Sequence, residues 1–341
     1  MRRASCPVLL FKKPDNLQRL RSMKKLLSIA AVLNRLTICS VLCGLCEKEY
    51  NCILHFTILT HCQTSLSIDM PEIANNNDSA SRWKFMEDIQ NHKDDRDIDI
   101  DRVGVKGIRY PITVLDKDMG EQQTVAEINM YVNLPRYYKG THMSRFVEIL
   151  NQHSRRISLQ SFSEILEEMK SKLDAQSSHM EMSFPYFINK AAPVTGIPGL
   201  MEYRCTMKGS LTSKSDLVVV INVPICTLCP CSKEISDYGA HNQRGEVRLQ
   251  VRFRRFVWLE ELIKMVEESA SSDVYSVLKR EDEKYVTERA YNNPMFVEDI
   301  VREIALKLTG DSNITWFSVE AENFESIHNH SAYAYIEKHK A

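Results

Sequence analysis

The side chains best suited to chemistry gather in one short motif in the second half of the chain. It holds three thiols within six residues and an imidazole shortly afterwards, namely Cys226, Cys229, Cys231 and His241. Thiolate and imidazole groups bind zinc and neighbouring metals. About ninety residues further on, the segment 322–330 adds carboxylates and two more imidazoles. The spacing therefore predicts a metal site that the fold closes from two separate loops.

Each of these side chains also has a simpler interpretation. The thiols could form a structural zinc knuckle, although no second Cys or His pair follows at short spacing. Pro230 stiffens the segment between Cys229 and Cys231, which disfavours binding of both sulfur atoms to one ion. Cys226 could be a buried, inert thiol, and His241 could be a hydrogen-bonded loop histidine.

The remaining acidic and imidazole positions are equally ambiguous. Glu283 stands in the charge run 279–284, whose composition alone predicts a solvated face. Glu298 lies beside the apolar stripe of an expected helix, where a surface carboxylate is common. His328 and His330 are two residues apart, so on a strand or tight turn only one is expected to point into a given site.

The elements that must position these residues follow from the spacing of apolar side chains. It predicts an α+β fold of two antiparallel ββααββ modules, 103–212 and 213–341, joined near 211–215. The expected strands are 107–114, 124–134, 180–188, 201–209, 217–223, 247–253, 314–320 and 332–336. The expected helices are 143–151, 161–173, 259–266 and 297–308. This places the thiol motif between two strands, Glu283 between two helices, and Glu325 with His328 in the last hairpin.

Length and composition fit a globular protein of about two domains. The 341 residues are 43% hydrophobic and 26% charged, with a formal net charge of −1. Near-neutral charge gives no case for nucleic acid or an acidic membrane surface as a partner.

The N-terminal part differs from the rest. Six of the ten cysteines precede Met70. The apolar run 26–33 has the order of a signal peptide, but it ends at Asn34 and is too short to span a membrane. We expect residues 1–69 to be an extension outside the fold, with a signal or anchor and an unrecognised tail as alternatives. We expect 70–102 to be a flexible leader. The later thiols, concentrated in one motif, indicate a reducing, cytoplasmic compartment.

Four long segments, taken in order, resemble the type IB GTP cyclohydrolases: 228–244, 278–288, 293–299 and 320–333. The segment 140–146 shows the same resemblance, which extends from about residue 100 to the C-terminus. Cys226 departs from the family, in which a hydroxyl residue is usual at that position.

The resemblance implies a tunnelling fold (T-fold) assembled as a homotetramer with sites between subunits. It also implies the reaction. GTP is hydrolysed at C8 of guanine, formate leaves, and ring closure gives 7,8-dihydroneopterin triphosphate, the first step of folate and often queuosine biosynthesis.

Site roles are carried over from the family residue by residue. One divalent metal per site (zinc, manganese or ferrous iron) would be held by Cys229, Glu283 and His328. His241 would be either the fourth ligand or the acid that protonates the purine nitrogen. A metal activates water for hydrolysis at neutral pH.

The same resemblance implies substrate contacts. Glu325 would accept two hydrogen bonds from the guanine edge. Glu298 would bind the ribose or relay protons. The triphosphate would be bound by cationic side chains, namely Lys233, Arg244 and Arg145.

Two other functions stay open at this stage. An NADPH-dependent nitrile reductase shares the fold and uses its cysteine as a covalent nucleophile without metal, but the pair His241 and His328 argues against it. The other is a non-catalytic, zinc-stabilised assembly module.

Overall fold

The computed structural model describes residues 88, 90, 92–153 and 159–340. They belong to one compact unit, Lys84–Ala341. The expected extension 1–69 lies outside the described residues, as does most of the expected leader. Within the described ranges, no helix has the length and apolar character needed to cross a membrane.

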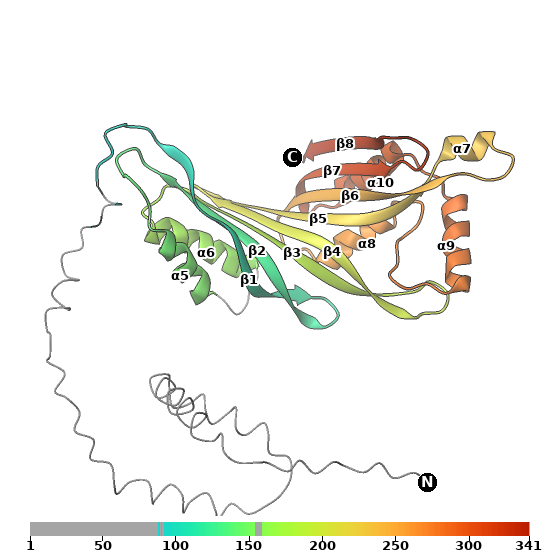
Figure 1. Ribbon diagram of the computed structural model, residues 1–341, viewed down its shortest axis with the longest axis horizontal. Helices are drawn as coiled ribbons and strands as arrows, with labels where there is room; N and C mark the ends of the chain where they lie inside the picture. The colour runs from blue at the N-terminus through green and yellow to red at the C-terminus, as the bar shows by residue number, and fades with distance from the viewer. Residues whose placement is uncertain (1–87, 89, 91, 154–158, 341) are drawn as a thin grey trace, which may run out of the picture. The chain divides into compact units, whose positions relative to one another are not determined.

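The described strands form one antiparallel sheet of eight strands, and their order in the sheet follows the sequence (Figure 1). Each strand pairs with the next, so β1 and β8 are the two edges. The strands are β1 (Ile100–Asp116), β2 (Gly120–Leu134), β3 (Ser178–Ala191), β4 (Pro198–Leu211), β5 (Ser215–Leu228), β6 (Asn242–Phe253), β7 (Ile314–Phe324) and β8 (Ser331–His339). All eight expected strands are confirmed.

Helices occupy three of the connections between these strands. They are α5 (Met143–Gln152) and α6 (Leu159–Lys172) before β3, α7 (Pro230–Ile235) before β6, and α8 (Leu259–Glu267), α9 (Arg280–Asn292) and α10 (Val297–Gly310) before β7. The α+β prediction and its four helices are confirmed.

Two described helices, α7 and α9, were not expected. The prediction that the second half repeats the order of the first is therefore wrong in this respect, and Glu283 lies within α9 rather than between helices. The reason is the absence of an apolar stripe: α9 buries only Asp282 and Ala290, and α7 buries no side chain.

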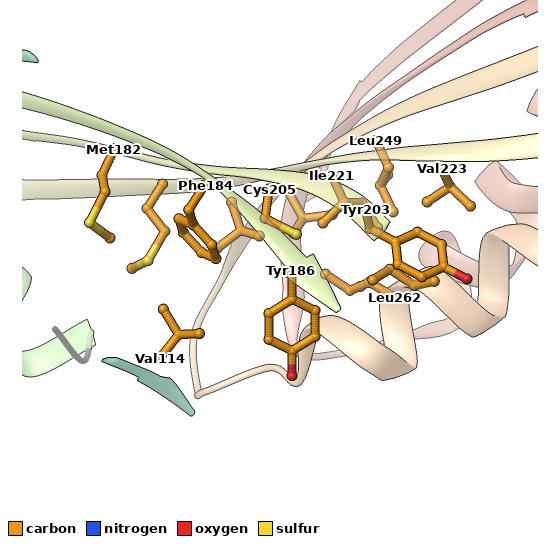
Figure 2. Packing of buried hydrophobic residues seen from close by; sticks show 14 of the residues in the cluster. Val114, Met182, Phe184, Tyr186, Tyr203, Cys205, Ile221, Val223, Leu249 and Leu262 are labelled. Carbon is orange, nitrogen blue, oxygen red and sulfur yellow. The ribbon is translucent and has the colours of Figure 1, made fainter. Parts of the chain in front are cut away.

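The core lies between the sheet and the apolar stripes of α5, α6, α8 and α10. Alternate residues of each central strand point into it, as the period-two pattern predicts. Figure 2 shows Tyr186 of β3 and Tyr203 of β4 close to Leu262 of α8. One cluster of buried side chains thus runs through both halves, and β4 pairs directly with β5. The division into two modules stays a prediction.

Candidate active site

The thiol motif lies where β5 and β6 leave the sheet. The two strands pair up to Leu228 and Asn242. Beyond this pair, the Cys229 N–H donates to the His241 carbonyl oxygen over 3.1 Å. Cys229 and His241, twelve residues apart in sequence, are therefore neighbours in the fold, where the loop between β5 and β6 begins and ends.

Ser232 holds this pair in place. Its N–H donates to Cys229 Sγ (3.4 Å), and its hydroxyl donates to the Cys229 carbonyl oxygen (3.2 Å). The same hydroxyl accepts the His241 N–H (3.2 Å). Pro230 takes the first position of α7, where its missing N–H costs nothing. Cys229 thus has a fixed place at the start of α7.

The His241 ring is oriented by its Nδ1 atom. Nδ1 lies 3.1 Å from the Gln243 side-chain oxygen and 3.1 Å from Ser326 Oγ. An amide oxygen can only accept, so this contact places the proton on Nδ1 and leaves Nε2 with its lone pair. Sequence reasoning missed Gln243, although it stands only two residues after His241. Among the residues that the structure describes, Nε2 has no hydrogen-bond partner, so it can bind a metal or serve in proton transfer.

The turn between β7 and β8 reaches the motif through Ser326. It also carries Glu325, which is half-buried, and the exposed His328 and His330. The two imidazole rings stack with centroids 5.1 Å apart and planes 19° apart. The tight turn thus brings both rings together, and the expectation that only one of them points into the site stays a prediction.

Glu283 is exposed in the first turn of α9, as the charge run suggested. The other end of α9 is the one near the motif, because Lys233 Nζ of α7 donates to the Tyr291 carbonyl oxygen (2.5 Å) and lies over the Tyr291 ring. Tyr291 follows Glu283 by eight positions, so at 1.5 Å per residue the two lie about 12 Å apart along the helix axis. Within the chain, Glu283 thus lies at the end of α9 that is remote from α7 and Cys229.

The remaining candidates lie at different distances from the motif along the fold. Glu298 is exposed in the first turn of α10, just after Met295, whose N–H donates to the Leu228 carbonyl oxygen (3.1 Å). Arg244 is exposed on β6, paired with Cys226 on β5. Arg145 lies on α5, where it donates to the Lys172 carbonyl oxygen (3.0 Å). The fold places Glu298 and Arg244 near the motif but Arg145 in the other half.

Cys226 is distinct from Cys229 in its surroundings. Its backbone exchanges two hydrogen bonds with Ser272, each of 3.2 Å. Burial raises the pKa of the Cys226 thiol, although the Arg244 charge opposes this effect. A raised pKa disfavours the thiolate form, so Cys226 is poorly suited to bind metal or attack substrate.

The donor atoms of the motif suit a metal only as part of a larger set. In the part of the chain that the structure describes, no three His, Cys, Asp or Glu side chains gather closely enough to hold an ion. The Cys229 sulfur and the free His241 Nε2 still offer the soft and borderline donors that zinc, manganese or ferrous iron accept.

Comparison with known proteins gives one consistent family. Residues 86–334 match the family described as type I GTP cyclohydrolase folE2. The GTP cyclohydrolase FolE2 of Syntrophobacter fumaroxidans is 62% identical over 257 residues, which cover 75% of this chain and 100% of the relative. That of Syntrophus aciditrophicus is 60% identical over 254 residues, which cover 74% and 100%.

Among solved structures, uricase from Arthrobacter globiformis aligns with 70% of this chain and 93% of its own, at 6% identity and a TM-score of 0.43. The sequence identity of the bacterial relatives, rather than this structural likeness, establishes the family. By the match over 86–334 and the identity of about three residues in five, the chain belongs to the type I GTP cyclohydrolase FolE2 family.

Proposed function

We propose that the protein is a GTP cyclohydrolase that converts GTP and water to 7,8-dihydroneopterin triphosphate and formate. The observation that carries the proposal is the 62% identity to a GTP cyclohydrolase FolE2 along that relative's whole length. The product would enter folate biosynthesis, and often queuosine biosynthesis, in the cytoplasm.

The proposal includes one divalent metal per site, bound by Cys229, His241, Glu283 and His328. The juxtaposition of Cys229 and His241 supports it. Opening an imidazole ring needs a strong nucleophile at neutral pH, and activation of water is the chemistry that a bound zinc, manganese or ferrous ion supplies.

The protein's own side chains would bind and orient GTP. Glu325 is proposed to accept hydrogen bonds from the guanine ring N–H and exocyclic amine, and Glu298 to contact the ribose or relay protons. If His241 is not a ligand, its Nε2 would carry the proton that the purine nitrogen receives when the ring opens, with Nδ1 held by Gln243. The triphosphate would be bound by Lys233, Arg244 and Arg145.

A tunnelling fold of type IB, assembled as a homotetramer with sites between subunits, is part of the same proposal. Two features support it. Within one chain, Glu283 lies in the first turn of α9, whereas α7, which follows Cys229, contacts the other end of α9 through Lys233 and Tyr291. In addition, Ile235, Tyr238 and Ile327, close to the motif, are exposed by 83%, 101% and 64%. Apolar side chains gathered around a charged site fit a contact with a second copy of the chain.

The proposal is tested by assaying metal-free protein with GTP after adding Mn²⁺, Fe²⁺ or Zn²⁺. We expect metal-dependent release of formate together with a fluorescent pterin after oxidation of the product. Oxidation of NADPH by a deazapurine nitrile, without GTP turnover, would instead establish the reductase. Bound zinc without either activity would establish the assembly module.

A further inference from the structure

Helix α9 carries a proposed metal ligand, yet it has almost no apolar contact with the core. Its buried residues are Asp282 and Ala290. A helix held by so little apolar area needs polar contacts to fix its position. The position of Glu283 therefore depends on the residues that bind α9 through hydrogen bonds and ion pairs.

Asp282, next to Glu283, makes the densest set of these contacts. Its side chain is fully buried. Oδ1 accepts the N–H groups of Val194 (2.8 Å) and Thr195 (2.9 Å). Oδ2 accepts the Thr195 hydroxyl (2.7 Å) and the Lys279 N–H (2.9 Å). Three of these four donors belong to the tip of the β3–β4 hairpin, so Asp282 connects the first half of the chain to the first turn of α9.

The same hairpin is held to α9 at a second point. Asp273, in the segment before α9, lies 3.0 Å from Lys190 Nζ of β3 and 3.1 Å from Arg289 Nη1 of α9. Lys190 also pairs with Glu267 at 2.8 Å. All three groups at the centre of this network, Lys190, Asp273 and Glu267, are largely buried. The ion pairs join the end of β3 to the last turn of α9.

Direct packing leaves the hairpin little freedom. A Cβ atom at Gly199, the second residue of β4, would lie 2.4 Å from Ser276 Oγ in the segment that leads into α9. In Figure 1, α9 stands between the end of the β3–β4 hairpin and α7. The hairpin thus supports the end of α9 that bears Glu283.

We propose that Asp282 is a positioning residue that fixes the first turn of α9 on the β3–β4 hairpin and so sets the Glu283 carboxylate for metal binding. This inference rests on the proposed function, in which Glu283 is a ligand. Residues that orient a ligand commonly change metal affinity by about 10- to 100-fold when they are replaced.

The test is a Co²⁺ titration of the metal-free, full-length protein, followed by the thiolate-to-cobalt absorption that reports the Cys229 sulfur. We expect Asp282→Ala to weaken Co²⁺ binding about tenfold or more while the thiolate band is kept at saturation. Asp282→Asn keeps one side-chain oxygen that can accept the hairpin N–H groups, so its loss of Co²⁺ affinity should be smaller. Thr195→Val, which removes one hydroxyl donor to Asp282, should also weaken Co²⁺ binding. It tests the same contact if Asp282→Ala does not fold.

Two comparisons separate positioning from general loss of stability. The double variant Asp282→Ala/Glu283→Ala should bind Co²⁺ no more weakly than Glu283→Ala, because Asp282 acts through Glu283. The matched control is Asp116→Asn. Asp116 is buried in the β1–β2 turn and accepts the N–H groups of Asp118 (2.9 Å) and Met119 (2.7 Å). The control should unfold more easily and bind Co²⁺ like the wild type.

The Co²⁺ titrations distinguish failure of the positioning role from failure of the ligand assignment. Wild-type Co²⁺ affinity in Asp282→Ala, with weak binding in Glu283→Ala, would overturn the positioning role alone. Additive losses in the double variant would overturn it as well. Unchanged binding in Glu283→Ala would show that the ligand assignment is wrong, and the positioning role would fall with it.

Discussion

At the scale of single residues, the motif separates two thiols that look alike in sequence. Cys229 Sγ accepts an N–H at the start of α7, beside His241. Cys226 lies on β5, where burial raises the pKa of its thiol and disfavours the thiolate. The two sulfur atoms therefore differ in their suitability for metal binding, although they are only three positions apart in sequence.

Replacement of each thiol tests this difference. Cys229→Ala should reduce GTP turnover to background, because a proposed ligand is lost. Cys226→Thr should change turnover by no more than about twofold, because it alters a side chain with no role in the site. Pterin fluorescence measured with equal amounts of folded protein compares them. An equal loss in both variants would favour a structural zinc knuckle.

The guanine contact can be assigned by comparing two carboxylates near the motif, Glu325 and Glu298. An amide in place of Glu325 would set a donor against a donor of guanine, which costs roughly 1–3 kcal/mol, or about 5- to 150-fold in kcat/KM. We expect this loss in Glu325→Gln, with metal content unchanged, and a smaller effect on KM in Glu298→Gln. The reverse order would move the guanine contact to α10, and loss of metal in Glu325→Gln would show that the turn has been assigned in the wrong register.

At the scale of helices and strands, the sequence pattern predicted those elements that are held in place by the burial of apolar side chains. The central strands β2 to β7 and the helices α5, α6, α8 and α10 each bury one face, which spaces their apolar residues regularly. Helices α7 and α9 lack such a face, so their sequences contain no comparable signal.

The same distinction applies to the residues of the site. Cys229 and His241 could be placed together because both flank paired strands. The contact of Asp282 with Thr195 joins residues 87 positions apart through polar atoms alone, and hydrogen bonds of this kind leave no periodic trace in a sequence. Nothing in the local sequence distinguishes Asp282 from the exposed acids of the same charge run.

The contact of Asp282 with the hairpin should also make stability depend on pH. Burial would raise the pKa of this carboxyl, but the hydrogen bonds from Thr195, Lys279 and Val194 outweigh it and hold the pKa well below its ordinary value of 3.8. A lowered folded-state pKa contributes stability above the ordinary value, and this stability is lost as the pH falls towards the folded pKa.

Urea unfolding at several pH values tests this linkage. Asp282→Asn should be less stable than the wild type at pH 7, and the difference between their midpoints should shrink as the pH falls below about 5. A constant difference down to pH 3 would mean that the carboxylate charge contributes nothing to the contact.

At the scale of the whole molecule, the proposed assembly predicts that one site takes Glu283 and Cys229 from two subunits. Mixing inactive Cys229→Ala and Glu283→Ala subunits should then restore activity. In a random mixture, about a quarter of the shared sites would combine an intact Cys229 with an intact Glu283. Turnover of the mixture at background level would mean that both ligands come from the same chain.

The attachment of the β3–β4 hairpin to α9 has a consequence for the hairpin itself. If the hairpin holds Glu283 in place for a metal, the bound metal must stabilise the hairpin by the same free energy, because coupling between two sites is reciprocal. The amide protons of Val194 and Thr195, which donate to Asp282, should therefore exchange with deuterium more slowly in the metal-loaded protein than in the metal-free protein. The amides of Asp118 and Met119, in the β1–β2 turn, should exchange at the same rate in both. Equal exchange at Val194 and Thr195 with and without metal would show that the hairpin and the site are independent.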